Sequence, residues 1–388
     1  MHPLLSQRAR NQTTSAIRDL LEQAKRPGMI SLAGGLPDPT LFPADQLASL
    51  AAECIRGDAD ATLQYGLTAG RVELREHIVA TTPAAATIDE VVVTTGSQQA
   101  LHLLSLVLLD PGDTVVVGDP DYLGALQAFR GAGAALAAVP IDDDGLDTDA
   151  LAARLAEGLR PAFVYVVPHF HNPTGVTLGS ARRAALLDLA DRYGFLVVFD
   201  DPYRELGVDG APAEPDPHPA AVQLRSISKV LAPGLRVGWM IAPAWLARAV
   251  EQAKQSADLH TSSLSQALAH AAITAPWFPT HVDGLRAATR TKRDVLLDAL
   301  TARFGEQIAT TTPTGGMFVW ATFADDTDTT TLLPVALDHG VAFVPGGAFG
   351  VDADHGASLR LSWATATPPQ LADAIDRLGA AHAALVSA

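Results

Sequence analysis

The alternation of short apolar runs with helical stretches is the feature that most restricts how this chain can fold. The runs are rich in β-branched residues and lie at Val91–Thr94, Thr114–Val117, Phe163–Val167, Leu196–Phe199 and Val222–Ile227, with helical stretches such as 100–109 and 181–193 between them. Strands that are apolar along their whole length are typical of a sheet covered on both faces, and strands that alternate with helices are typical of parallel pairing. The sequence therefore predicts an α/β domain in which helices sandwich a mostly parallel sheet.

A different pattern begins near residue 285. It is helical to Leu300, strand-like at 317–322 and 358–362, and helical again from Pro369. This order predicts a smaller α+β domain over residues 285–388, beside a large domain over residues 46–284. Residues 1–45 are too few for a domain, so we expect them to form an N-terminal arm and part of the small domain. A chain of 388 residues exceeds what one hydrophobic core usually supports, in agreement with two cores.

Charge and composition exclude several classes of partner. The chain has 27 Lys and Arg against 43 Asp and Glu, a net charge of -16, which repels nucleic acids and anionic membranes. The longest apolar stretch, 101–109, is far shorter than the roughly 20 residues that span a bilayer. A single cysteine, Cys54, cannot form an intrachain disulfide, and Arg8 and Arg10 interrupt any signal-peptide pattern. We expect a cytoplasmic protein without nucleic-acid or membrane partners.

Polar residues follow several of the predicted strands. In open α/β sheets ligands bind at the carboxyl ends of the strands. Gly96-Ser97-Gln98-Gln99 opens a helix and offers N–H groups and a hydroxyl to an anion, although Ser97 could equally be an ordinary N-cap. The other polar runs are 200–203 and 226–229, and the second ends in Lys229.

Lysine is rare here, with 4 residues against 23 arginines. An ammonium group at the end of a buried strand is costly to desolvate unless it is paired or neutralised. For Lys229 this favours a lowered pKa and Schiff-base chemistry. The alternative is a surface lysine whose stem alone is buried.

The chain resembles the fold-type I pyridoxal-phosphate aminotransferases. The resemblance is carried by four motifs in order over nearly the whole chain: Asn172-Pro173-Thr174-Gly175, Asp200 with Tyr203, Ser226-Ile227-Ser228-Lys229 with Arg236, and Arg360 in Leu359-Arg360-Leu361-Ser362. Further motifs are similar to the 2-aminoadipate (LysN-like) aminotransferases and the aminotransferase domain of MocR regulators. They include Ala33-Gly34-Gly35-Leu36-Pro37, Gln64-Tyr65-Gly66 and Gly315-Gly316-Met317-Phe318.

The resemblance implies an aspartate-aminotransferase-like large domain that binds pyridoxal 5'-phosphate, and it assigns catalytic roles. Lys229 would carry the cofactor as an aldimine and then move the substrate proton. Asp200 would keep the ring nitrogen protonated. Asn172 and Tyr203 would donate to the phenolic oxygen, and Tyr122 would stack on the ring, unless Tyr122 is a plain core tyrosine.

The resemblance also implies the phosphate and substrate contacts. Residues expected to bind the phosphate are Ser97, Gln98, Ser226, Ser228 and Arg236, together with Tyr65 from a second subunit of a homodimer. Arg360 would bind the substrate α-carboxylate; the alternative is a surface ion pair. Asn172 and Gly35 are also expected at the substrate, and Arg18 would bind an acidic side chain unless it is an ordinary exposed helix arginine.

Three bulky or unusual residues depart from the subgroup and suggest a reshaped pocket. His171 replaces the usual Gln before Asn172, and Trp239 and Trp363 are larger than the typical residues. His169 and His171 alternate on one predicted strand face, a spacing that can bind metal, but no further ligand is near in sequence. We therefore expect no metal.

The predicted function is a ping-pong aminotransferase that moves an amino group between an L-amino acid, such as glutamate or 2-aminoadipate, and a 2-oxo acid such as 2-oxoglutarate. One alternative is another pyridoxal-phosphate reaction, oxidation or elimination, in secondary metabolism, because a fold does not define a reaction. The other is a non-enzymatic cofactor-sensing regulator. That alternative is disfavoured because residues 1–10 lead almost directly to the arm and leave no room for a DNA-binding domain.

Overall fold

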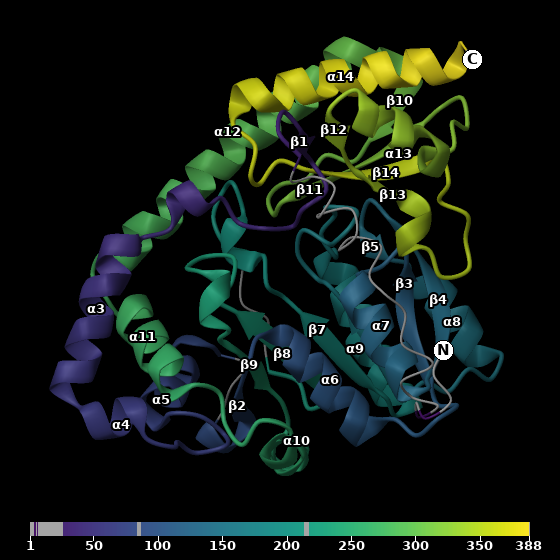
Figure 1. The fold of residues 1–388 in the computed structure, drawn as a ribbon. Coiled ribbons are helices and arrows are strands. Elements are labelled where there is room, and N and C mark those ends of the chain that lie inside the picture. Colours follow the sequence, from purple (N-terminus) through teal and green to yellow (C-terminus); the bar gives the residue numbers. More distant parts are fainter. Residues whose placement is uncertain (1–3, 5, 7–25, 84–86, 213–216, 388) are drawn as a thin grey trace.

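An eight-stranded sheet forms the centre of the larger part of the molecule (Figure 1). The computed structural model describes residues 4, 6, 26–83, 87–212 and 217–387. The strand order is β2-β9-β8-β7-β6-β3-β4-β5. The bounds are β2 (Val91–Thr94), β3 (Thr114–Asp119), β4 (Ala135–Asp142), β5 (Gly145–Leu146), β6 (Phe163–Val166), β7 (Leu196–Asp200), β8 (Ala221–Ser226) and β9 (Gly238–Ile241).

Pairing in this sheet is mostly parallel. Pairing is parallel within the group β4, β3, β6, β7 and β8. The strand β9 is antiparallel to both β2 and β8, and β5 is antiparallel to β4. The predicted α/β fold with a mostly parallel sheet is therefore confirmed.

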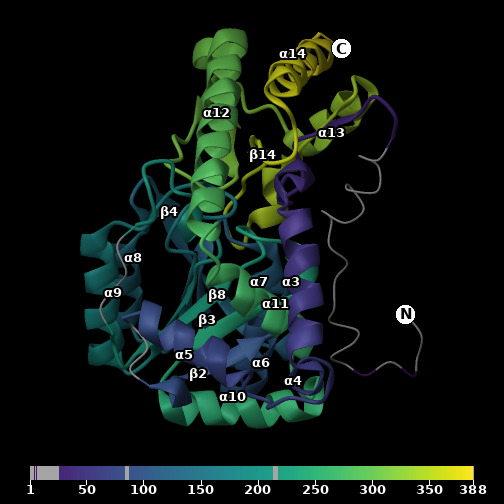
Figure 2. The ribbon, with the colours of Figure 1, turned by 90° about the vertical axis from the view of Figure 1, so that its left-hand side faces the viewer.

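Successive residues of each central strand belong to two different cores. Val115 and Val117 of β3 pack in one core with α6 (Ser97–Leu108), α7 (Leu123–Ala132) and α10 (Ala244–Ala257). Val116 lies in the other core with α8 (Thr148–Ala156) and α9 (Ser180–Tyr193). Figure 2 shows α8 and α9 on one side of the strands and α6 and α7 on the other. The fully apolar strands therefore have helices on both faces.

The C-terminal part has a sheet and a core of its own. Its antiparallel sheet has the order β10 (Ile308–Thr310), β11 (Phe318–Phe323), β14 (Ser358–Ser362), β13 (Val344–Pro345). The helices α12 (Phe278–Phe304), α13 (Thr329–Asp338) and α14 (Pro368–Val386) pack on it. The N-terminal strand β1 (Ile30–Ser31) pairs with β12 (Val341–Ala342), so the start of the described chain joins this part.

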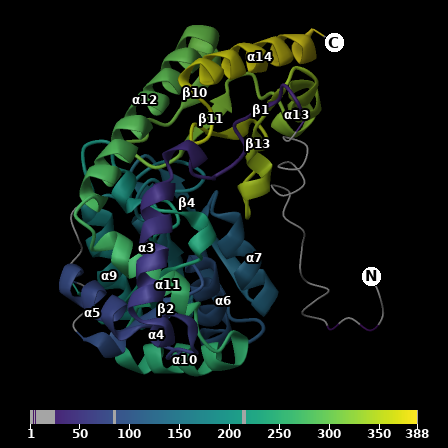
Figure 3. The ribbon, with the colours of Figure 1, turned by 60° about the vertical axis from the view of Figure 1, so that its left-hand side comes forward.

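The helix α12 joins the two parts (Figure 3). It is continuous for 27 residues, so residue 284, where the sequence analysis ends the large domain, lies within a helix. The division into domains stays a prediction. The remaining helices are α3 (Ala44–Gly57), α4 (Ala59–Leu63), α5 (Val72–Thr81) and α11 (Ser263–Ile273), with 3-10 turns at 39–41, 88–90, 204–206, 233–235, 305–307 and 346–349. In the described part of the chain, no helix combines the length and apolar character needed to cross a bilayer.

Candidate active site

The predicted site residues gather where the strands of the large sheet end. Asp200 is the last residue of β7, Asn172 lies in the loop after β6, and Lys229 follows β8. Arg360 comes from β14 of the smaller sheet. The charges of Arg360, Arg236 and Asp200 all act on the Lys229 amine, so residues far apart in sequence form one site between the two sheets.

The Lys229 amine is held inside this site. Its Nζ donates a hydrogen bond to the Gly35 carbonyl at 2.8 Å and lies 5.8 Å from the centre of the Tyr203 ring. Burial, with the positive charges of Arg360 and Arg236, lowers the pKa of Lys229 to about 8. A substantial fraction of the amine is therefore neutral and nucleophilic near neutral pH. The side chain is not the surface lysine of the alternative interpretation.

Asp200 has one carboxylate oxygen with a partner and one without. The Tyr165 hydroxyl donates to Oδ2 at 3.0 Å, whereas Oδ1 is buried and has no hydrogen-bond partner among the described residues. Burial raises the pKa of Asp200 to about 7. A buried carboxylate oxygen without a donor is costly. The environment of Asp200 therefore fits a ligand with a cationic N–H, such as the protonated ring nitrogen of pyridoxal phosphate.

The start of α6 lies against the Arg236 guanidinium. The N-cap of α6 is Gly96, which has φ 79° and provides no side-chain cap, so the interpretation of Ser97 as the N-cap is wrong. A Cβ at Gly96 would collide with the Arg236 guanidinium, and the Arg236 Nη2 donates to the Thr95 carbonyl at 3.1 Å. A helix N-terminus, a hydroxyl at its first residue and a guanidinium fork suit a phosphate group.

Two serines in the turn after β8 add hydroxyl groups to the site. The Ser226 hydroxyl donates to the Ser228 hydroxyl at 2.9 Å, and the Ser228 backbone N–H donates to the Ser226 hydroxyl at 3.1 Å. The pair keeps both hydroxyls next to Lys229, in the turn where the sequence motif predicts phosphate contacts.

Tyr122 is fixed by Gln98 and by the absence of a side chain at residue 124. The Tyr122 hydroxyl donates to Gln98 Oε1 at 3.2 Å, and Gln98 Nε2 donates to the Gly124 carbonyl at 2.8 Å. A Cβ at Gly124 would lie 2.5 Å from the Tyr122 ring carbon Cζ. Burial, and then the charge of Asp200, raises the pKa of Tyr122 to about 12. Tyr122 therefore stays neutral and offers an aromatic face in the site, as a ring-stacking residue requires.

Arg360 is a buried cation without a carboxylate partner in the described part of the chain. It is 2% exposed, and its Nη1 and Nη2 donate to Asn172 Oδ1 at 2.8 Å and to the Ala33 carbonyl at 2.5 Å. Its guanidinium lies 4.3 Å from the Phe318 ring, and its buried Nε has no partner among the described residues. Burial lowers the pKa of Arg360 to about 10, so the group stays charged at neutral pH. The surface ion pair of the alternative interpretation is wrong, and this environment suits a substrate carboxylate.

Tyr203 and Phe318 complete the inner wall of the site. Tyr203 is 5% exposed, and its ring meets Phe318 edge to face at 5.9 Å. Burial raises the pKa of Tyr203, which keeps its hydroxyl protonated as a donor. Sequence reasoning did not assign Phe318, Tyr165 or Gly124 to the site, because each was hidden in an apolar or small-residue pattern.

The two histidines have separate partners. Both lie beyond the end of β6 and not on a strand, which corrects the predicted shared strand face. His169 Nδ1 lies 2.9 Å from Asp201, whereas His171 lies 3.1 Å from Asp121 through Nε2 and 2.9 Å from Thr174 through Nδ1. No three His, Cys, Asp or Glu side chains of the described residues form a group that could hold a metal. His171 therefore supports the loop that carries Asn172.

The two tryptophans differ in their distance from the site. Trp363 is 1% exposed and borders a cavity of about 40 Å³ that Lys229 also lines. Trp239 instead borders a separate cavity of about 280 Å³ beside His77. Of the two tryptophans, Trp363 is the one that borders a cavity together with Lys229.

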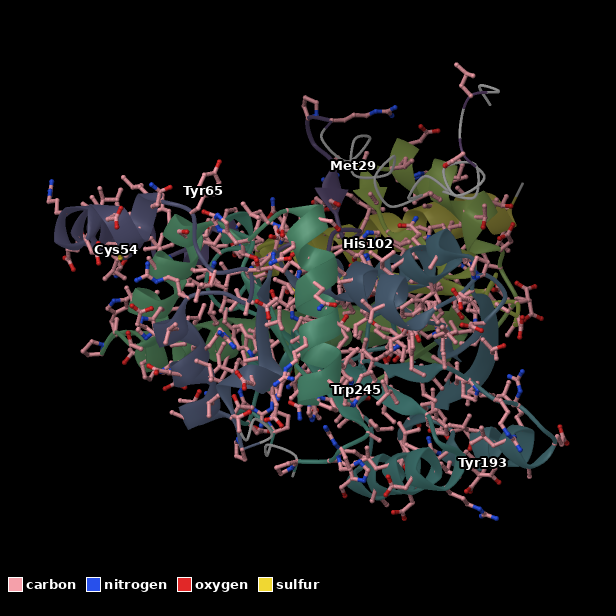
Figure 4. The ribbon with its side chains drawn as sticks, turned by 90° about the horizontal axis from the view of Figure 1, so that it is seen from below. Met29, Cys54, Tyr65, His102, Tyr193 and Trp245 are labelled. Carbon is pink, nitrogen blue, oxygen red and sulfur yellow. The ribbon has the colours of Figure 1, made fainter. Side chains whose placement is uncertain are left out.

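Tyr65 does not join the site within one chain. It is 79% exposed and projects from the surface, with its ring 5.8 Å from His260 (Figure 4). Its predicted contact with the phosphate of a second subunit stays a prediction. Arg18 lies outside the described residues.

Comparisons with known proteins agree with this geometry. The family model of aminotransferase class I and II matches residues 29–378. The chain is 40% identical to a 2-aminoadipate transaminase of Thermus thermophilus over 96% of this chain and 95% of the relative. It is 37% identical to aromatic-amino-acid aminotransferase 1 of Thermococcus litoralis over 96% and 92%. The crystal structure of the α-aminoadipate aminotransferase LysN from Thermus thermophilus, complexed with N-(5'-phosphopyridoxyl)-L-leucine, has a TM-score of 0.91 and 38% identity, covering 99% of this chain and 98% of that chain.

Proposed function

This chain belongs to the class I and II aminotransferases, and from that premise we propose that it binds pyridoxal 5'-phosphate on Lys229 and transfers the amino group of an acidic L-amino acid to a 2-oxo acid. The observation that carries the proposal is the environment of three groups in one site. Lys229 has an amine with a lowered pKa. Among the described residues, Asp200 Oδ1 finds no donor and the Arg360 guanidinium finds no carboxylate, and the cofactor and the substrate would provide these partners.

The residues present fit the cofactor along its whole length. Ser97, Ser226, Ser228 and Arg236 would hold the phosphate with the N–H of Gln98, and Asp200 would hold the ring nitrogen. Tyr122 would lie on the ring, and Asn172 and Tyr203 would donate to its phenolic oxygen. When bound, pyridoxal phosphate supplies an aldehyde carbon that condenses with amines and a protonated ring that accepts the electron pair released at the substrate Cα.

The side chains of this chain then have separate tasks. Arg360 binds the α-carboxylate and fixes the orientation of the Cα–H bond. The Lys229 amine would take the proton from the substrate Cα and deliver it to the aldehyde carbon of the cofactor, C4′. A base with a pKa near 8 can both accept and release a proton at neutral pH. The buried carboxylate of Asp200 holds positive charge on the ring nitrogen throughout.

The proposed assembly is a homodimer in which Tyr65 reaches the second site. Its support is the exposure of three large hydrophobic side chains within five residues, with Leu63 61%, Tyr65 79% and Leu67 59% exposed. Burial of these side chains in a symmetric dimer would remove their apolar surface from water. The cytoplasmic location stays a prediction.

The proposed substrates are glutamate, 2-aminoadipate or a similar acidic amino acid, with 2-oxoglutarate or a related 2-oxo acid as acceptor. The test is the pair of variants Arg18→Ala and Arg360→Ala. If Arg18 binds the distal carboxylate, Arg18→Ala lowers kcat/KM for glutamate and 2-aminoadipate by about 10- to 100-fold, because a charge-assisted hydrogen bond contributes roughly 1.5–3 kcal/mol. The same variant leaves leucine unaffected. Steady-state kinetics with the three amino acids measures this.

Arg360→Ala is the matched control, because every amino acid carries the α-carboxylate. We expect it to penalise glutamate and leucine alike. Equal losses for both substrates in Arg18→Ala would show that Arg18 is structural, and the acidic-substrate proposal would then be wrong.

A further inference from the structure

A short backbone segment covers the candidate active site and contacts two of its main residues. We name residues 32–38 the cover segment. Its Gly35 carbonyl accepts the hydrogen bond from Lys229 Nζ at 2.8 Å, and its Ala33 carbonyl accepts from Arg360 Nη2 at 2.5 Å. Whatever fixes the cover segment therefore also sets the surroundings of the Lys229 amine and the Arg360 guanidinium.

The beginning of the cover segment is fixed by backbone hydrogen bonds. The Leu32 N–H donates to the Ala342 carbonyl at 2.7 Å, and the Leu32 carbonyl accepts from the Ser362 N–H at 2.8 Å. After Leu32 the backbone of the cover segment is held differently. Within the described part of the chain, no N–H from Gly34 to Asp38 donates to another backbone group.

The end of the cover segment is held by one ion pair. Asp38 Oδ2 lies 2.6 Å from Lys292 Nζ, with the two side chains only 12% and 10% exposed. Lys292 belongs to α12 and also donates to the Ala364 carbonyl at 2.9 Å. The second oxygen of Asp38 accepts from the Thr40 N–H at 2.9 Å. Burial alone would raise the pKa of Asp38, but the hydrogen bonds from Lys292 and Thr40 lower it, so the Asp38 carboxylate is charged at neutral pH.

The ion pair and Lys229 border the same cavity. Asp38, Lys292, Lys229 and Trp363 line the same cavity of about 40 Å³. Counted over the whole residue, Lys292 is 8% exposed. It is one of 4 lysines in a chain that has 23 arginines. Removing one member of a buried pair leaves the other charge without compensation, so loss of either residue should weaken the hold on the cover segment.

We propose that the Asp38–Lys292 ion pair is a latch that holds the cover segment closed, and that both residues are positioning residues acting through the Gly35 and Ala33 carbonyls on Lys229 and Arg360. The inference rests on the proposed roles of Lys229 and Arg360. In the closed arrangement the Ala33 and Gly35 carbonyls orient the guanidinium and the amine that the substrate meets. The latch sets how much of the enzyme is closed and competent before substrate arrives.

The latch predicts a change in KM more than in kcat. If only a fraction of the enzyme is closed, the apparent dissociation constant rises by the inverse of that fraction, while saturating substrate restores closure. In Lys292→Met we expect KM to rise about 10-fold for glutamate and leucine alike, with kcat within about twofold. Asp38→Asn should have the same effect, and the double variant should be no worse than either single variant, because the two residues act as one unit.

The test measures hydrogen exchange of the cofactor-loaded full-length protein by mass spectrometry, together with the kinetics. Peptides spanning residues 34–42 should exchange about 10-fold faster in Lys292→Met and Asp38→Asn than in the wild type, and Lys292→Arg should restore most of the protection. The matched control is Arg377→Met. Arg377 holds the chain just before the cover segment, at the Gly28 carbonyl, and its loss should change neither the exchange of 34–42 nor KM.

Unchanged exchange over 34–42 in both latch variants, or a fall in kcat without a rise in KM, would overturn the proposal. Asp38→Asn is the milder change and tests the latch even if Lys292→Met does not fold. The exchange measurement needs no turnover, so a failed latch leaves the roles of Lys229 and Arg360 to be decided by their own variants.

Discussion

Lys229→Ala is expected to lower the rate of transamination by at least about 10⁴-fold, because it removes both the covalent attachment of the cofactor and the base that moves the proton. The amine is the one described group that combines a pKa near 8 with a place beside Asp200 and Tyr203. The phosphate contacts of Arg236 and the serines remain, so some cofactor should still bind. Steady-state rates, with bound cofactor determined by absorbance, measure both effects.

Lys229→Arg is the control that separates charge from chemistry. It keeps a positive charge at residue 229, but a guanidinium stays protonated and cannot act as a nucleophile or base near neutral pH. We expect it to be as inactive as the alanine variant. A near wild-type rate in either variant would mean that another group carries the cofactor, and the assignment of Lys229 would be wrong.

Asp200→Asn is expected to slow the removal of the Cα proton by about 100-fold or more, because a neutral amide cannot hold positive charge on the ring nitrogen. Stopped-flow absorbance of the reaction with amino acid alone measures this step. An unchanged rate would show that another residue keeps the ring protonated.

The same variant has an opposite effect on the stability of the protein without cofactor. Burial raises the pKa of Asp200 from 3.8 to about 7, so the folded state favours the protonated form. The stability that this group contributes is complete below pH 3.8 and is lost as the pH rises through 7. The loss corresponds to about 4 kcal/mol at pH 8. Cofactor-free Asp200→Asn should therefore have a higher Tm than the cofactor-free wild type at pH 8, and a smaller advantage at pH 5. Equal differences at both pH values would contradict the raised pKa.

The sequence predicted strands best where apolar residues run together or alternate regularly. The runs expected at 358–362 and 91–94 coincide with β14 and β2, and the run expected at 196–199 agrees with β7 to within one residue. The strand β4 was missed because its sequence, ALAAVPID, is rich in alanine and contains a proline. The strand β9 was missed because four residues beginning with glycine form too short a pattern, and its antiparallel direction depends on pairing that only the folded sheet determines.

The sequence predicted the site residues that lie at the ends of strands. It did not predict the residues that contact them from within buried elements. Lys229 and Asp200 are polar residues after apolar runs, so their positions were visible, whereas Asn172 was found only through its motif. Tyr165 lies within a buried strand and gave no signal for its hydrogen bond to Asp200. The pairing of Asp38 with Lys292 joins residues 254 positions apart, which no local pattern indicates. For the two histidines the sequence predicted a shared strand face that the structure does not contain. The strand β6 ends at Val166, and His169 and His171 lie beyond it and contact different carboxylates.

The most direct test of the account is the half-reaction. The cofactor-loaded enzyme is mixed with glutamate and no 2-oxo acid, and the cofactor is then released and identified. We expect pyridoxamine phosphate on the protein and one equivalent of 2-oxoglutarate per site, with the original cofactor restored when a 2-oxo acid is added. Release of ammonia, or consumption of oxygen with the cofactor unchanged, would contradict transamination and would point to elimination or oxidation on the same site.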